Sequence, residues 1–110
     1  MQSWDLGDLD VKPHQPEVIE SGDEGRAIVI ELPAGERMGE HQVHERAWLL
    51  VVSGRVEVSD SAGGSASGGP GLLAVFDPNE RHEVSAREDS RLLLLLSPWP
   101  GVGHPSESPD

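Results

Sequence analysis

Of the stretches that are apolar at every position, two restrict the fold more than any other feature. They are Ala47 to Val52 and Leu92 to Leu96, each bounded closely by polar or glycine residues. Both are far shorter than the ~20 residues of a membrane-spanning helix. Successive side chains of a strand point to opposite faces, so an apolar strand has to be covered on both. We therefore expect a second subunit, or the N-terminal arm of one, to cover the outer sheet, which makes the chain a homodimer.

The rest of the chain divides into short strand-like segments separated by turn residues. The expected strands are 26–32, 36–43, 47–52, 55–59, 72–76, 82–86 and 91–96, with a further edge strand near Val18 and Ile19. Ser53-Gly54 has the form of a two-residue hairpin turn, and the glycine-rich segment 61–71 is expected to be a mobile loop or a poorly ordered hairpin tip. Regularly spaced short strands favour an all-β sandwich or barrel.

Length and composition limit the function classes. A chain of 110 residues makes one domain, expected here as an extended N-terminal arm (1–24), a barrel (25–98) and a flexible C-terminal tail (99–110). The formal net charge of −12 disfavours nucleic acid and anionic membranes as partners. The chain has no cysteine, which excludes disulfides and thiolate chemistry. The N-terminus lacks the pattern of a signal peptide, and we expect a cytoplasmic location.

Two segments carry a histidine close to turn residues, and their spacing resembles that of a known family. The first runs from Gly35 through His41 to Gly54, and the second runs from Gly71 to His82 with a proline between them. This pattern is similar to the two motifs of the small single-domain cupins, the cupin 2-like, RmlC-like jelly-roll barrels. The resemblance implies an all-β double-stranded β-helix, with both motifs meeting at the mouth of the barrel.

The metal-binding motif of the family is degenerate in this chain. The positions of a second histidine and of a glutamate in the first motif are occupied by Val43 and Ala47. Because alternate residues of a barrel strand point inward, we expect one face of these strands to line a ligand pocket. The expected pocket residues are His41, Val43, Ala47, Leu49 and Val51, joined by His82 from the second motif.

A catalytic metal normally needs three protein ligands, so His41 and His82 would require a third. With His44, the set suits zinc, nickel or iron; with Glu45, it becomes the two-histidine, one-carboxylate set of non-haem iron enzymes. Manganese is a further candidate. The favoured interpretation is a pocket without metal, because two ligand positions are apolar. His44 and Glu45 are then expected on a solvated turn.

The preferred function is binding of a small molecule in the barrel, as a sensor or accessory protein. One alternative is a metal-dependent cupin enzyme, an oxygenase or isomerase acting on a small polar substrate. A second is a structural or interaction module whose barrel is filled by side chains. No catalytic residue is assigned, because no nucleophile–base–carboxylate arrangement is present. By strand parity Trp48 should face outward as an interface residue, and Trp99 should pack over one end of the barrel.

Overall fold

The computed structural model describes residues 1–41 and 43–103, and for residues 39–41 it describes the backbone. This part of the chain contains strands and turns, and no helix in it could cross a membrane. The strands are β1 (Glu17–Gly22), β2 (Gly25–Leu32), β3 (Arg37–His41), β4 (Arg46–Ser53), β5 (Val56–Asp60), β6 (Ser65–Gly68), β7 (Leu73–Phe76), β8 (His82–Ala86) and β9 (Ser90–Ser97).

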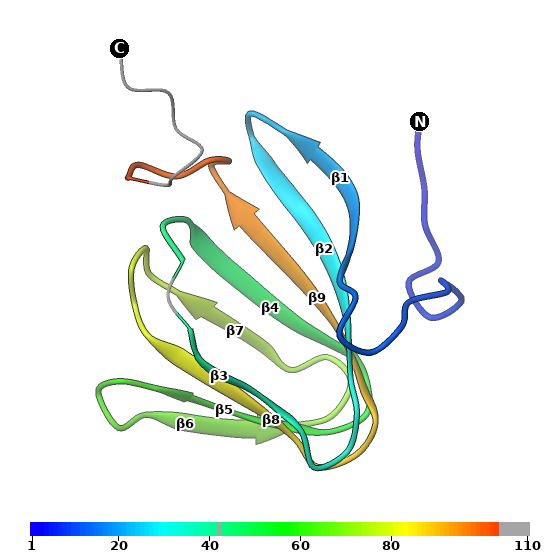
Figure 1. The fold of residues 1–110 in the computed structure, drawn as a ribbon, viewed down its shortest axis with the longest axis vertical. Helices are drawn as coiled ribbons and strands as arrows, with labels where there is room; N and C mark the ends of the chain where they lie inside the picture. Colours follow the sequence, from blue (N-terminus) through cyan, green and yellow to red (C-terminus); the bar gives the residue numbers. More distant parts are fainter. Residues whose placement is uncertain (42, 104–110) are drawn as a thin grey trace.

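Two antiparallel sheets face each other (Figure 1). The first has the order β1-β2-β9-β4-β7 and the second has the order β3-β8-β5-β6. All the strands expected from the sequence are present, within a few residues at their ends, and β1 is the expected edge strand. The expected all-β jelly-roll class is therefore confirmed. Because β1 belongs to the first sheet, the arm that precedes the sheet ends at Pro16.

Two local expectations were wrong. The glycine-rich segment contains strand β6, which pairs with β5 from Val56↔Gly68 to Ser59↔Ser65. Backbone hydrogen bonds hold this pairing and need no large side chains. The Ser53-Gly54 turn does not form a hairpin, because β4 and β5 lie in different sheets and the turn carries the chain from one to the other. Gly54 does have the expected positive φ, of 89°.

The core lies between the two sheets and follows from the alternation of their strands. In β9 the residues at even positions from Ser90 to Leu96 are buried, and Leu92 is completely inaccessible. Strands β5 and β8 alternate in the same way and contribute valines from the opposite side. Each fully buried Leu or Val side chain stabilises the fold by ~1.5–3 kcal/mol, so this layer provides most of the driving force.

The outer face of the first sheet is also apolar. The register places Trp48 opposite both Leu95 and Val75, so the expected outward direction of Trp48 is confirmed. A hollow of about 600 Å³ lies on this face, floored mainly by leucines of β4, β7 and β9. The described residues therefore cover the outer faces of β4 and β9 only in part.

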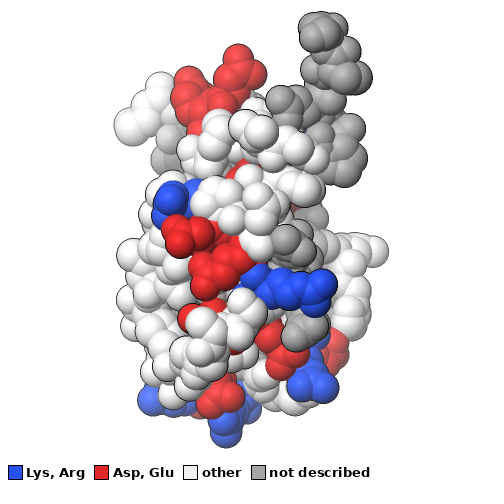
Figure 2. Space-filling model, turned by 90° about the vertical axis from the view of Figure 1, so that its left-hand side faces the viewer, with Lys and Arg blue, Asp and Glu red and all other residues white. Residues whose placement is uncertain are grey.

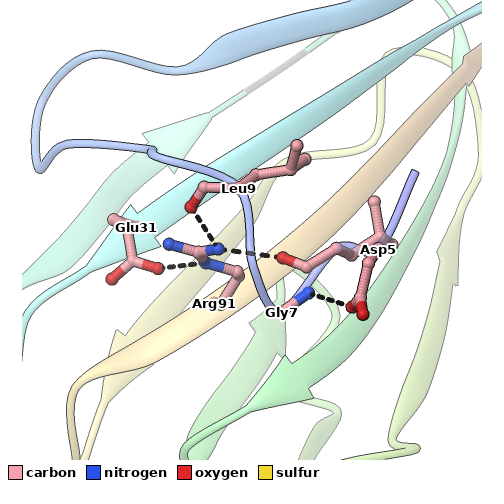
Figure 3. A network of polar contacts seen from close by, with 6 residues as sticks. Asp5, Gly7, Leu9, Glu31 and Arg91 are labelled. Carbon is pink, nitrogen blue, oxygen red and sulfur yellow. Dashed lines mark hydrogen bonds and ion pairs between the residues drawn. The ribbon is translucent and has the colours of Figure 1, made fainter.

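The N-terminal arm covers one end of this outer face (Figure 3). The Arg91 guanidinium donates hydrogen bonds to the carbonyl oxygens of Leu6 and Leu9, at 2.9 and 2.7 Å, and pairs with the Glu31 carboxylate. Val11 on the arm and Val29 on β2 are both buried, yet neither belongs to the core between the sheets. The chain thus uses its own arm to cover part of the sheet, and Arg91 anchors the arm there.

We predict that Arg91→Lys loosens the arm, because an ammonium group cannot reproduce the fork of the guanidinium. The free energy of unfolding should fall by about 1–3 kcal/mol in urea titrations, and the Val11 amide should exchange faster. The matched control is Arg87→Lys, because Arg87 pairs with Glu57 in a largely exposed position. The control should change stability by less than about 0.5 kcal/mol. Equal effects of the two substitutions would show that the arm is not anchored in this way.

Candidate functional site

The two histidine segments lie side by side at one end of the barrel. In the register of β3 and β8, His41 is the partner of His82. The Asn79 amide donates a hydrogen bond of 2.7 Å to the Val43 carbonyl, which joins the β3–β4 loop to the β7–β8 loop. The Arg46 guanidinium also reaches the Asp77 carboxylate at 2.8 Å. These contacts bring the two segments together, as the sequence predicted.

His82 is a buried and oriented imidazole. Its exposed fraction is 5%, and its ring stacks on Phe76 with centroids 4.0 Å apart and planes 14° from parallel. Its Nδ1 lies 3.3 Å from the Glu80 carbonyl oxygen. A carbonyl can only accept, so this contact favours the tautomer of the neutral ring that carries its proton on Nδ1. His82 therefore has a fixed orientation, which is a property expected of a binding-site histidine.

Glu45 occupies a position that the sequence interpretation did not anticipate. Its exposed fraction is 1%, and its Oε2 accepts a hydrogen bond of 2.7 Å from the Gly101 amide. The expectation that Glu45 sits on a solvated turn was wrong, because the C-terminal segment folds back over it. A carboxylate that satisfies a buried amide in this way is a structural anchor in this conformation.

The other expected site residues lie at different depths. Ala47 and Leu49 face inward and are buried within the core cluster, whereas Val43 is half-buried against it. His44 is half-buried, close to the turn around Gly103. The side chain of His41 lies outside the described residues, so its part in the site stays a prediction. The alternation of residues along β4 therefore identifies which side chains point inward. Contact between these side chains and a ligand stays a prediction.

Open space on this side of the barrel lies at the edges of β6 and β7 rather than around the pocket residues expected from the sequence. A cavity of about 350 Å³ opens between the edges of these strands, lined by residues of β5, β6, β7 and Glu80. A smaller notch of about 90 Å³ includes His82 and shares Ser59 and Asp60 with the larger cavity. The alternating pattern of residues 55–59 could have indicated the β5 wall, but nothing in the glycine-rich sequence indicated the β6 wall.

The residues described here do not make a metal site. In this part of the chain no three histidine, aspartate or glutamate side chains converge. Glu45, one candidate for the third ligand, is directed to the Gly101 amide. Two of the positions at which the resemblance implies ligands carry the apolar side chains of Val43 and Ala47. The donor set of the described residues therefore does not fit a catalytic metal, and we derive no chemistry through one.

The surface at this end carries charges of both signs. Figure 2 views the molecule from the side on which the β3–β4 and β7–β8 loops lie in Figure 1, and acidic atoms alternate there with basic atoms. The chain as a whole is strongly acidic, but this face does not form a continuous negative patch. The net charge of the chain therefore does not describe the local charge at this end.

Comparison with known families agrees with this architecture. The family model described as a cupin domain matches residues 28–98. The chain belongs to the cupin family. No curated protein matches the sequence of this cupin.

Solved structures show the same fold. An RmlC-like cupin protein from Desulfovibrio desulfuricans has a TM-score of 0.79 and 18% identity, over 89% of this chain and 97% of that chain. KdgF from Halomonas sp. has a TM-score of 0.70 and 27% identity, over 82% and 85% of the two chains. DMSP lyase DddQ from Ruegeria pomeroyi DSS-3 has a TM-score of 0.67 and 20% identity, over 81% of this cupin and 43% of the lyase. These likenesses establish the fold, which does not by itself determine the activity.

We predict that His82→Ala leaves the cupin folded but less stable, because it removes a buried ring that stacks on Phe76. The free energy of unfolding should fall by about 1–3 kcal/mol, with the circular dichroism of the sheets retained. The matched control is His14→Ala on the exposed arm, which should change stability by less than about 0.5 kcal/mol. Complete unfolding of the His82 variant would mean that the imidazole is needed for the core and is not primarily a site residue.

Proposed function

We propose that this cupin binds a small molecule in the cup between its two sheets, as a sensor or accessory protein. The observation that carries the proposal is the cavity of about 350 Å³ between the edges of β6 and β7. That volume lies within the range of small-ligand sites. The space between the edges of β6 and β7 is therefore large enough for a small ligand, which favours binding over a purely structural module.

The lining of this cavity suits a small ligand with both apolar and polar parts. Val58, Ala74 and Phe76 provide apolar walls, and Asp60 and Glu80 are acidic groups on its lining. The buried ring of His82 supports Phe76 from behind. A ligand with an apolar body and a hydrogen-bond donor matches these groups. The larger hollow on the outer sheet is an open apolar surface remote from the histidines, so we assign it to protein contact instead.

We predict that filling the cavity abolishes binding. Ala66 pairs with inward-facing Val58, so Ala66→Trp places an indole in the cavity, whereas Ser67→Trp on the same strand places it on the opposite face. A thermal-shift screen of small metabolites should find compounds that stabilise the wild type and Ser67→Trp but not Ala66→Trp. Compounds that stabilise all three proteins equally would place the ligand elsewhere. A screen of a broad library without any such compound would argue against the proposal.

A metal-dependent enzyme, an oxygenase or isomerase, is the alternative. It would use His41 and His82 with His44 or Glu45, and the backbone pairing of His41 with His82 is the observation in its favour. The DMSP lyase neighbour is an example of an enzyme with this fold. Equilibrium dialysis against zinc, nickel, iron or manganese, followed by elemental analysis, decides between the two. One tightly held metal ion per chain would replace the metal-free proposal with this alternative.

We also propose that two copies of the cupin associate through the outer face of the first sheet. The support is the row of exposed apolar side chains there, including Leu73 with an exposed fraction of 56%, Val75 and Leu95. Burying such a row is favourable by ~25 cal/mol per Å² of apolar surface.

A cytoplasmic location also remains our proposal, and cell fractionation with an antibody would test it.

We predict a solution mass twice the 11.8 kDa of one chain, measured by sedimentation at micromolar concentration. Leu95→Glu should raise the dissociation constant at least about tenfold, because it would bury a carboxylate in the apolar interface at a residue that does not line the ligand cavity. The control is Val102→Glu, at a more exposed apolar residue that does not line the hollow on this sheet face. A monomeric wild-type protein at these concentrations would exclude the dimer.

A further inference from the structure

The cavity between β6 and β7 carries charge of one sign on its described lining. Asp60, at the end of β5, and Glu80, in the β7–β8 loop, both line it, and no described lysine, arginine or histidine does. Arg81 and His82 line the smaller notch beside it instead. A charge at a concave site with apolar walls acts more strongly than one on an open surface, because less water screens it. The cavity therefore attracts a ligand of positive charge.

Asp60 has an oriented side chain. Its Oδ1 accepts hydrogen bonds from the Ala62 and Gly64 amides, at 2.9 and 2.8 Å, and the Asp60 amide donates to the Gly64 carbonyl at 3.0 Å. These contacts close the β5–β6 turn and fix the carboxylate through one of its two oxygens. A ligand that binds the second oxygen therefore has little side-chain freedom to remove, which favours binding.

The space beside this second oxygen depends on the glycine at position 64. A Cβ atom there would lie 2.7 Å from Asp60 Oδ2, and Gly64 itself lines the cavity. Any side chain at this position would therefore push against the oxygen. Among residues 1–41 and 43–103, no hydrogen bond or ion pair reaches Oδ2. The turn thus holds one carboxylate oxygen open at the wall of the cavity.

Glu80 is held in a similar way by its own loop. Its Oε1 accepts a hydrogen bond of 2.9 Å from the Asp77 amide, which leaves Oε2 for another contact. Calcium takes about six to eight oxygen ligands, and no three acidic or histidine side chains of the described chain converge. The apolar walls, which include Val58 and Phe76, suit an organic body. Carboxylates beside apolar walls match an organic cation better than a metal ion.

We propose that the ligand of this cavity is a small protonated amine, whose ammonium group binds to Asp60 and Glu80. The inference rests on the proposed function, because it names the class of ligand that the cavity takes. An ammonium group has N–H donors only, and its charge-assisted hydrogen bonds to carboxylates are about twice as strong as neutral ones. Asp60 is the residue that determines specificity, and Gly64 keeps it accessible.

Three probes with one phenyl body and different head groups test the charge preference. They are phenethylamine, phenethyl alcohol and 3-phenylpropionate, and the shifts of the Ala62 and Gly64 amides in nuclear magnetic resonance spectra report binding beside Asp60. Phenethylamine should bind at least about tenfold more tightly than the alcohol, and 3-phenylpropionate should bind least. Added sodium chloride should weaken binding of the amine more than that of the alcohol. Equal binding of all three probes, or no shift with millimolar phenethylamine, would overturn the proposal.

Charge-removing variants identify the carboxylate. Asp60→Asn retains an oxygen that accepts the turn amides, so the fold should persist while the preference for phenethylamine over the alcohol falls at least about fivefold. Gly64→Ala should weaken binding of the amine although both carboxylates remain. The matched control is Glu57→Gln, because Glu57 lies on the opposite face of β5, pairs with Arg87 and removes the same charge. Equal effects of Asp60→Asn and Glu57→Gln would show that only net charge matters, which overturns the proposal.

The Ala66→Trp variant separates this proposal from the proposed function. Probes that bind without charge preference and are blocked by Ala66→Trp would retain the cavity and overturn the amine. Binding of the amine that persists in Ala66→Trp would overturn its place in the cavity. Calcium that shifts the same amides and is not displaced by phenethylamine would assign the carboxylates to a metal ion instead. The series of probes on the wild-type protein needs no substitution, so it decides the question even if a variant unfolds.

Discussion

The fold depends on covering both faces of two central strands, β4 and β9. Their inner faces meet valines of the opposite sheet and form the core. Their outer faces cannot be left entirely to water, because they carry large apolar side chains at every second position. The chain meets this requirement in stages, with its own arm at one end of the sheet and an open apolar hollow over the rest. The apolar residues of β4 and β9 therefore determine the character of the outer surface as well as that of the core.

The same barrel separates two kinds of recognition. The outer face of the first sheet is broad, open and apolar, which suits a flat protein surface. The space between β6 and β7 is smaller and includes acidic groups near an oriented imidazole. Small-molecule sites usually combine an apolar lining with a few placed polar groups. Leu73 lines both regions, so a partner on the outer face would lie beside a ligand in the cavity.

The strands could be predicted well because their signals are local. Residues 26–32, 47–52 and 91–96 show β-branched or apolar runs between turn residues, and each became a strand. Strand β6 was missed because main-chain hydrogen bonds alone specify it. The turn at Gly54 was located correctly, but a local turn signal cannot say that the next strand joins another sheet.

The site was predictable only where strand parity or the family resemblance applied. The pairing of His41 with His82 follows from the two motifs and from antiparallel register. The burial of Glu45 could not be predicted, because its hydrogen-bond partner, Gly101, is 56 residues away in sequence and lies in a segment without periodicity. The cavity likewise depends on the distance between two strand edges, which no single stretch of sequence encodes.

The order of the first sheet has a consequence for how the protein is made. β9 is the last strand of the described chain, yet it lies in the middle of the sheet between β2 and β4. While the ribosome is still translating the earlier strands, β2 and β4 have no partner to join them. Such unpaired edges are prone to aggregation until the missing strand arrives. The nascent chain therefore cannot complete its larger sheet until β9 has been synthesised.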